Sequence, residues 1–353
     1  MSGAFGWIRN DDGGDGGRST RAAASGFRDA VTGYQPQPSA RSVPRKRATP
    51  PPDPPRNLGT FAAAARRGST PTARHELRST AANVLIVIQD VTGSMGDKPG
   101  EIFRRLPRLW HDAAKYLGTD DLEILFIAHG DARTDTHAVQ VARFGRGPEL
   151  DEHLASFTID GGGGGQGTES HELVAYYLLT RVDTSTARNV YAFFITDEAA
   201  CDTIAKNLVT QELGVTRQPE HANTRTVFDA LRTRMHVYAV LFPPESYDPV
   251  PIREWWEKTL GREGILPLDD PRRIVDVLLG TLAAATGQTD AFADDLRSRQ
   301  MPTQHGQQNV ATVMQSIALV GRGTPSSPHV LPKGGGTRPL LTSGTANTPS
   351  RKR

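Results

Sequence analysis

This chain has little cysteine, few aromatic residues and no long apolar run. Its 353 residues include a single cysteine, Cys201, which excludes a disulfide framework within the chain and favours a reducing compartment. No stretch approaches the roughly 20 consecutive apolar residues that span a bilayer, so we expect no membrane span. The first residues run into Asp and Gly and lack the charged and apolar regions of a secretory signal. These absences predict a cytoplasmic protein.

Acidic residues are missing from the C-terminal part of the chain, although the net charge of the whole is only +2. Residues 299–353 carry 7 Lys/Arg and no Asp/Glu, and residues 1–80 carry 13 Lys/Arg against 6 Asp/Glu, which leaves residues 81–298 at −12. Basic tails can bind nucleic acid or anionic surfaces without sequence preference. Because the charges are spread out rather than packed in blocks, we favour the simpler interpretation that arginine keeps the tails soluble.

Low apolar content indicates that part of the chain does not fold. Hydrophobic residues make up 37% of the sequence, beside 35 Gly and 25 Pro. Residues 1–80 have no sustained period and cannot bury enough apolar surface to offset the cost of ordering, so we predict a disordered basic tail with at most a helical turn over Phe61–Arg67. Residues 322–353 return to Gly, Pro, Ser and Thr and are predicted to form a second disordered basic tail.

Between the tails, apolar runs of strand length alternate with amphipathic segments. Buried strands are predicted over 84–88, 122–128, 190–195 and 237–242, with an edge strand at 139–144 and a short last strand at 264–268. Helices are predicted over 101–117, 149–156, 171–180, 200–209, 226–234, 252–260 and 274–285, and two more at 290–299 and 310–319 form a helical C-terminal extension, 289–321. This alternation over 81–288 predicts an α/β domain with a doubly wound, mostly parallel central sheet and helices on both faces.

Oxygen-bearing side chains follow the first predicted strand, a later glycine-rich loop and the third buried strand. The set consists of Asp90, Thr92, Ser94, Thr168 and Asp197. Because open α/β sheets bind ligands at the carboxyl ends of their strands, we expect these side chains to converge. Two carboxylates would offset the charge of a divalent ion and three hydroxyls would complete the cage, which suits Mg²⁺, Mn²⁺ or Ca²⁺. The plainer interpretation of the first three residues is a polar turn that caps the next helix.

The run Asp90-Val91-Thr92-Gly93-Ser94-Met95 resembles the metal-ion-dependent adhesion site of von Willebrand factor A (vWA) domains of the prokaryotic intracellular type. The family pattern is Asp-x-Ser/Thr-x-Ser after the first strand, a Thr in a later loop and an Asp after a subsequent strand, and Thr168 and Asp197 match the later two parts in order. The resemblance covers about residues 83–287. It implies the Rossmann-like vWA fold and metal-mediated binding of an acidic residue on a partner, usually without catalysis. It also implies direct coordination by Thr92, Ser94 and Thr168, with Asp90 and Asp197 often acting through water.

The sequence departs from the family pattern beside the predicted ligands. Glu198 follows Asp197 where glycine is frequent, and its carboxylate could either repel an incoming acidic ligand or take the open coordination position itself. Asp131 lies at the same predicted edge and either supports the ligands through hydrogen bonds or caps a helix. Five consecutive glycines, 161–165, carry a large backbone entropy, so we predict that residues 161–168 become ordered on metal or partner binding.

Other side chains near this edge have plainer interpretations. His129 and His171 are predicted to form a packed or surface pair rather than to bind metal, because the oxygen-rich set selects hard cations. Cys201 has no nameable basic partner to activate it and is predicted to be a small buried residue. The glycine run looks like a phosphate loop, but no Lys-Ser/Thr follows it. Trp255 and Trp256 are predicted to anchor their helix to the sheet.

Two classes of function fit these residues. The first is a non-catalytic adaptor that recognises a carboxylate of a protein partner through a divalent cation, and family analogy suggests an ATPase or kinase complex as that partner. The second is a phosphotransfer or phosphatase-type enzyme with Asp90 as nucleophile, since residues 90–94 also resemble the Asp-Lys-Thr-Gly-Thr motif of P-type ATPases. The motif lacks the lysine, and Thr92 stands where related phosphatases carry a second acid. We therefore favour the adaptor.

Overall fold

The computed structural model describes residues 77–159, 161–162, 167–215 and 221–321. The two predicted disordered tails lie outside these residues, apart from residues 77–80 of the first, and so does the predicted turn at Phe61–Arg67. Strand β1 (Leu77–Arg78) falls within the range predicted as tail, yet it pairs in parallel with β6 (Val182–Asp183). The folded body therefore begins a few residues earlier than the composition indicates.

A six-stranded sheet forms the centre of the fold. Its strands are β2 (Asn83–Asp90), β3 (Leu122–His129), β4 (Val139–Val141), β7 (Asn189–Thr196), β11 (His236–Leu241) and β12 (Ile265–Pro267). Their order across the sheet is β12-β11-β7-β2-β3-β4, and every neighbouring pair is parallel except β3 and β4. The chain thus starts in the middle, grows to one edge and then to the other, so the strand order reverses between β2 and β7. The predicted α/β class with a mostly parallel sheet is confirmed, and ligands bind such sheets at this reversal point.

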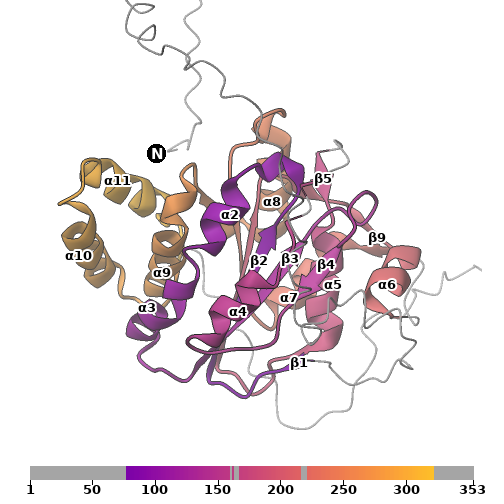
Figure 1. Cartoon of the computed structure of the whole chain (residues 1–353), viewed down its shortest axis with the longest axis horizontal. Helices are drawn as coiled ribbons and strands as arrows, with labels where there is room; N and C mark the ends of the chain where they lie inside the picture. Colours follow the sequence, from indigo (N-terminus) through magenta and orange to yellow (C-terminus); the bar gives the residue numbers. More distant parts are fainter. Residues whose placement is uncertain (1–76, 160, 163–166, 216–220, 322–353) are drawn as a thin grey trace, which may run out of the picture. The chain divides into compact units, whose positions relative to one another are not determined.

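Helices cover both faces of the sheet, and the alternation of β2 side chains explains why both faces need cover. Val84, Ile86 and Ile88 belong to one apolar core, whereas Leu85 and Val87 belong to the other. The first core is closed by α5 (His171–Arg181), α6 (Lys206–Leu213), α7 (Thr224–Arg232) and α8 (Pro249–Leu260). The second is closed by α2 (Lys98–Phe103), α3 (Pro107–Leu117), α4 (Glu149–Ala155), α9 (Ile274–Ala285), α10 (Thr289–Gln300) and α11 (Gly306–Ser316). Figure 1 shows α3, α9, α10 and α11 on one side of the sheet and α5 and α6 on the other.

The two C-terminal helices share the core of the body. Phe292 of α10 and Ile317, just after α11, are buried in the same apolar cluster as α9. They pack so closely over Gly280 that a Cβ there would lie 2.7 Å from the Phe292 ring and 2.9 Å from Ile317. The predicted extension therefore packs back on the domain.

Two predicted helices differ from the structure for identifiable reasons. The helix predicted over 101–117 is two helices, because Pro107 occupies the first position of α3, where its missing N–H costs nothing. The first half of the helix predicted over 200–209 is wrong. There β8 (Ala199–Ala200) pairs with β5 (Thr168–Glu169), and β9 (Thr203–Ala205) pairs with β10 (His221–Asn223). Strand pairing with distant segments overrides the local helix preference of this stretch.

No helix among the described residues has the length and apolar content needed to cross a bilayer.

Candidate metal centre

The predicted site residues Asp90, Thr92, Ser94 and Asp197 meet at the point where the strand order reverses. Asp90 is the last residue of β2 and is fully buried, and the chain then turns through Thr92 into a 3₁₀ turn, Gly93–Met95. Asp197 follows the last residue of β7, the strand beside β2. The carboxyl ends of these two parallel strands thus bring a local motif together with an acid more than a hundred residues away.

Two hydrogen bonds and one close contact between hydroxyl oxygens link the four side chains. Thr92 Oγ1 donates to Asp90 Oδ1 at 2.6 Å, and Ser94 Oγ donates to Asp197 Oδ1 at 2.9 Å. The two hydroxyl oxygens lie 3.1 Å apart. In an octahedral Mg²⁺ site with metal–oxygen distances near 2.05 Å, neighbouring ligand oxygens are about 2.9 Å apart. The oxygens of Thr92, Ser94 and Asp197 already have that spacing, so they fit a small hard cation.

Thr196 holds Asp90 in place, and the sequence did not single it out as a site residue. Its Oγ1 donates to Asp90 Oδ2 at 2.8 Å and accepts from the backbone N–H of Glu198 at 3.0 Å. On the other side, Asp90 Oδ1 accepts from the backbone N–H of Thr92 at 2.9 Å. Both carboxylate oxygens are therefore occupied, and the acid is fixed in orientation. The available signal was the hydroxyl-acid pair Thr196-Asp197 at the end of a buried strand.

Thr168 lies in a neighbouring segment and does not join this chain of hydrogen bonds among the described residues. It belongs to β5, which pairs in parallel with β8 just after Asp197. Its Oγ1 lies 3.7 Å from the Sγ of Cys201. The next residue, Glu169, is buried and lines the pocket described below. The segment thus approaches the site as expected, and Glu169 is a second residue, after Thr196, that the sequence did not single out.

The glycine-rich loop packs directly on the turn after β2. The backbone N–H of Gly93 donates to the carbonyl of Gly162, and the N–H of Gly161 donates to the carbonyl of Val91 at 3.3 Å. A Cβ on Gly93 would lie 2.7 Å from the Gly161 carbonyl oxygen, so only glycine permits this approach. The predicted ordering of residues 161–168 on binding stays a prediction, because residues 163–166 lie outside the described chain.

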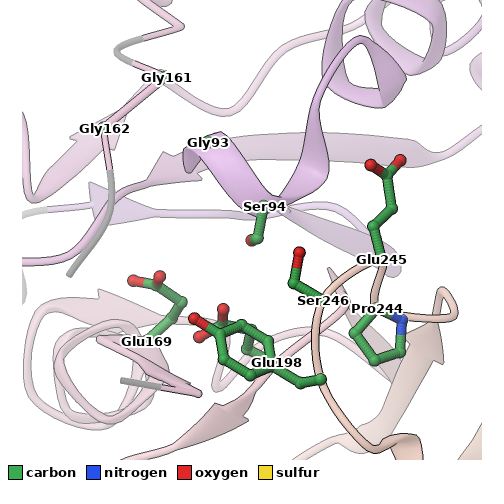
Figure 2. Close-up of a pocket in the computed structure, with 10 residues that line it drawn as sticks. Gly93, Ser94, Gly161, Gly162, Glu169, Glu198, Pro244, Glu245 and Ser246 are labelled. Atoms are coloured by element: carbon green, nitrogen blue, oxygen red, sulfur yellow. The ribbon is translucent and has the colours of Figure 1, made fainter. Parts of the chain in front are cut away.

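These segments enclose a cavity of about 390 Å³. Its wall consists of Gly93, Ser94, Gly161, Gly162, Glu169, Glu198, Pro244, Glu245, Ser246 and Tyr247. Figure 2 shows Ser94, Glu169 and Glu198 around one space, with the loop of residues 244–246 closing it from β11. Ser94 belongs both to the set of hydrogen-bonded oxygens and to the cavity wall. The described lining residues include no lysine, arginine or histidine.

The acids of the site are difficult to ionise without a cation. Burial raises the pKa of Asp90, and burial followed by repulsion from Asp90 raises the pKa of Asp197 to about 6. Burial, Asp197 and Asp90 raise the pKa of Glu198 to about 7. Burial, with Asp90 and Glu198 next in importance, raises the pKa of Glu169 to about 10. The common cause is desolvation among like charges, which a bound cation would reverse.

A second set of donors shares Asp90. Ligand atoms of Asp90, His129 and His171 lie within 4.8 Å of one another, and all three residues are buried, so this group could hold a metal ion. Burial lowers the pKa of His129 to about 4 and that of His171 well below its usual value, so both rings are neutral. The rings also pack edge to face, with centroids 4.4 Å apart, as the predicted packed pair requires.

The two predicted supporting acids have different roles. Asp131 stabilises its own turn: its Oδ1 accepts from the backbone N–H of Arg133 at 3.0 Å, and Ser170 Oγ lies 3.4 Å away. Glu198 lines the cavity, and its backbone carbonyl accepts a 2.9 Å hydrogen bond from the indole N–H of Trp256. Trp255 and Trp256 are both buried, which agrees with their predicted anchoring role.

Comparison with known proteins does not identify the family of this chain. No protein-family model and no curated protein matches it. The pilus adhesin SpaC from Lactobacillus rhamnosus GG, in its open conformation, aligns with 60% of this chain at 10% identity and a TM-score of 0.41, over 31% of the adhesin. Proximal thread matrix protein 1 from the mussel byssus aligns with 61% of this chain at 8% identity and a TM-score of 0.38, over 49% of its length. The chain thus spans less than half of either protein, and such distant likenesses carry no conclusion about its family or function.

Proposed function

We propose that this chain is a non-catalytic, divalent-cation-dependent module that binds a protein partner. The observation that carries this proposal is the chain of oxygens from Asp90 through Thr92 and Ser94 to Asp197, which has the spacing of an octahedral ligand set and opens on a cavity. Binding energy in such a site comes from a partner oxygen that completes the coordination of the ion. The partner therefore supplies a carboxylate.

Hydroxyl and carboxylate oxygens from three segments of the chain would hold the ion. Thr92, Ser94 and Asp197 present oxygens at ligand spacing, and the second oxygen of Asp197, Oδ2, is buried with no hydrogen-bond partner among the described residues. Such an orphaned acceptor is costly unless a cation or water meets it. Asp90 would contribute its negative charge through its hydrogen bond to Thr92. Thr168, on β5, is a further candidate ligand. The ion, Mg²⁺ or else Mn²⁺ or Ca²⁺, would polarise and bind the partner's carboxylate.

Apolar side chains near the cavity support a protein partner. The described residues include four large hydrophobic side chains that are exposed; of these, Tyr247 lines the cavity, and Ile159 and Val250 lie two and three positions along the chain from the lining residues Gly161 and Tyr247. Protein interfaces commonly place apolar and aromatic contacts around a polar centre. A surface of this composition suits a partner that is anchored by the ion and held by surrounding contacts.

The vWA family accounts for this combination of features, and we propose it as the family of the chain. The support is the Asp-x-Thr-Gly-Ser motif on the middle strand of a mostly parallel sheet, with an acid on the adjacent strand. By analogy with intracellular members, the partner would be a component of an ATPase or kinase complex.

The alternative, an enzyme with Asp90 as nucleophile, fits the geometry poorly. A nucleophile needs a free oxygen at an accessible surface. Asp90 is fully buried, and its two carboxylate oxygens accept hydrogen bonds from Thr92 and Thr196. A phosphoryl acceptor in this position could not reach a substrate without breaking these bonds.

Metal-dependent capture tests the proposal. Full-length wild type and Ser94→Ala would be used to capture partners, each with Mg²⁺ and with a chelator, and Mn²⁺ binding would be measured in parallel by electron paramagnetic resonance. We expect a partner that is lost with the chelator and with Ser94→Ala, together with weaker Mn²⁺ binding by the variant. Ser298→Ala is the matched control, because Ser298 is an exposed serine on α10 whose hydroxyl donates to the carbonyl of Asp295 in the same helix. A partner retained under all conditions would contradict the proposal.

His129→Gln separates the two donor sets that share Asp90. If the ion binds the hydroxyl and carboxylate oxygens, the variant keeps its affinity for Mg²⁺ and Mn²⁺. If affinity falls in His129→Gln but not in Ser94→Ala, the ion sits between Asp90 and the histidines, where imidazole favours Zn²⁺ and related metals.

A further inference from the structure

The cavity wall and the candidate metal centre beside it hold more carboxyl groups than one divalent ion can balance. Asp90 and Asp197 together match the charge of one such ion. Glu169 and Glu198 then remain, each only 2% exposed and both in the cavity wall. A nearby cation, Lys98, is directed to Glu245, with Nζ–Oε1 at 3.5 Å. A ligand that brought only a carboxylate would therefore add repulsion to a site that is already acidic.

Glu169 and Glu198 each keep an oxygen without a partner. Oε2 of both residues is buried and makes no hydrogen bond to the described part of the chain. Figure 2 shows both residues below Ser94, and both side chains line the cavity. Buried carboxylates elsewhere in proteins are paired, because an isolated buried charge is very costly. Two free oxygens aimed into one cavity thus indicate a positively charged ligand that arrives from outside.

We propose that Glu169 and Glu198 bind an arginine side chain of the partner, next to the partner carboxylate that reaches the ion; this rests on the proposed function. The partner motif then contains neighbouring residues of opposite charge. The acidic residue completes the coordination of the ion, and the basic residue bonds the remaining two carboxyl groups, with its single charge offsetting the one that the partner's acid brings.

The shape and lining of the cavity favour a guanidinium over a second metal ion or an ammonium group. The volume of about 390 Å³ far exceeds the space that one ion needs, and Pro244 and Tyr247 give the wall an apolar and aromatic part. A guanidinium is planar, offers five donors and can bond two carboxylates at once while it stacks on an aromatic ring. The ammonium group of lysine is compact and strongly hydrated, and it has no planar surface that could stack on the aromatic part of the wall.

Small probes test this inference without knowledge of the partner. N-acetyl-arginine amide, N-acetyl-citrulline amide and N-acetyl-lysine amide would each be titrated into the full-length Mg²⁺-loaded protein by ligand-observed NMR. Citrulline has nearly the shape of arginine but no charge. We expect saturable binding of the arginine probe, weaker binding of the lysine probe and none of the citrulline probe. Glu169→Gln and Glu198→Gln are each expected to weaken arginine binding about tenfold, since each removes one charge-assisted contact.

Glu245→Gln is the matched control. Glu245 also lines the cavity, but its carboxylate is 75% exposed, pairs with Lys98 and points away from the other two acids. Its replacement is expected to change arginine binding by less than about twofold. Mn²⁺ binding measured on the same samples is expected to persist in Glu169→Gln, so failure of this inference is separable from failure of the metal site.

Several results would overturn the inference. Equal binding of arginine and citrulline would show that charge is not recognised, and no saturable arginine binding by the wild type would show that the cavity does not take this group. Equal or tighter lysine binding would reject the guanidinium. A second Mn²⁺ ion in the wild type that disappears in Glu169→Gln would assign the two acids to a metal instead. Because the citrulline and lysine tests use the wild type, they remain decisive even if a variant fails to fold.

Discussion

The buried acid Asp276 and the buried acids of the candidate metal centre differ in whether the fold supplies hydrogen-bond donors for all their carboxylate oxygens. Asp276 on α9 is 9% exposed at its side chain and is surrounded by donors: Arg299 at 2.8 Å, Arg273 at 3.2 Å and Gln300 at 3.3 Å. Asp197, Glu169 and Glu198 at the β2–β7 edge are also buried, yet each has an oxygen without a partner in the described chain. The first arrangement joins α9 to α10 and is complete within the fold. The second is incomplete, which is the expected state of a site whose cation comes from elsewhere.

The difference predicts opposite effects of the same kind of substitution. An acid that is paired within the fold contributes to stability, so its neutralisation should destabilise the protein. An acid held among like charges opposes folding when no cation is bound, so its neutralisation should stabilise the cation-free protein while binding is lost. Four substitutions test or sharpen this distinction.

Asp197→Asn is expected to have the largest effect. Loss of one charged ligand should weaken Mg²⁺ or Mn²⁺ binding about 100-fold, whereas the cation-free protein should become more stable by about 1 kcal/mol because repulsion from Asp90 is relieved. Isothermal titration calorimetry and urea unfolding in chelator measure the two quantities. Unchanged metal affinity would remove Asp197 from the site.

Asp276→Asn is the converse. The substitution leaves Arg273 and Arg299 without their acidic partner, and we expect a loss of about 2 kcal/mol of unfolding free energy, less than for a fully buried pair because Arg299 is partly exposed. Mg²⁺ affinity should stay within about twofold of the wild type, since additivity holds for distant sites. A variant more stable than the wild type would contradict the conclusion that Asp276 is an acid whose pairing stabilises the fold.

Gly93→Ala tests the contact between the glycine-rich loop and the motif turn. The added Cβ would meet the Gly161 carbonyl oxygen at 2.7 Å, so either the turn or the loop must shift. We expect Mg²⁺ affinity to fall about tenfold, because ligand positions near Ser94 move by a few tenths of an ångström. Gly100→Ala, in α2 with open space around its Cβ, is the control and should bind normally. Equal affinities of the two variants would show that the loop does not shape the site.

Glu172→Gln should have the smallest effect, on the pH dependence of stability. Burial raises the pKa of Glu172 to about 8 in the folded protein, above the ordinary value of 4.5. The folded state then holds a proton that the unfolded state releases, so stability falls as pH rises from about 5 to 8. Glutamine cannot titrate, so the variant should lose less stability than the wild type between pH 5 and pH 8. Parallel urea unfolding curves at pH 5 and pH 8 make the measurement; an identical pH dependence of the two proteins would contradict the shifted pKa.

Much of the fold could be predicted because local patterns and tertiary structure agree. The run Val84–Ile88 is apolar at every position, and the structure buries it between two helical layers. Pro271 and Gly287 bracket the helix predicted over 274–285, and α9 has those bounds. The stretch after Asp197 was harder, because its strands exist only through pairing with residues far away in the chain. Local preference cannot report such pairing.

For this protein, the sequence by itself predicted the alternation of strands and helices and the convergence of four oxygen-bearing side chains, those of Asp90, Thr92, Ser94 and Asp197. Those inferences need only periodicity and the rule that parallel strands end at one edge of a sheet. Only the tertiary structure decided that Thr196 holds Asp90 and that Gly93 admits the glycine-rich loop. It also decided that Glu169 and Glu198 line one cavity, each with a carboxylate oxygen that has no hydrogen-bond partner among the described residues. Each of these depends on distances between segments that are remote in the chain, and such distances are set by packing rather than by local pattern.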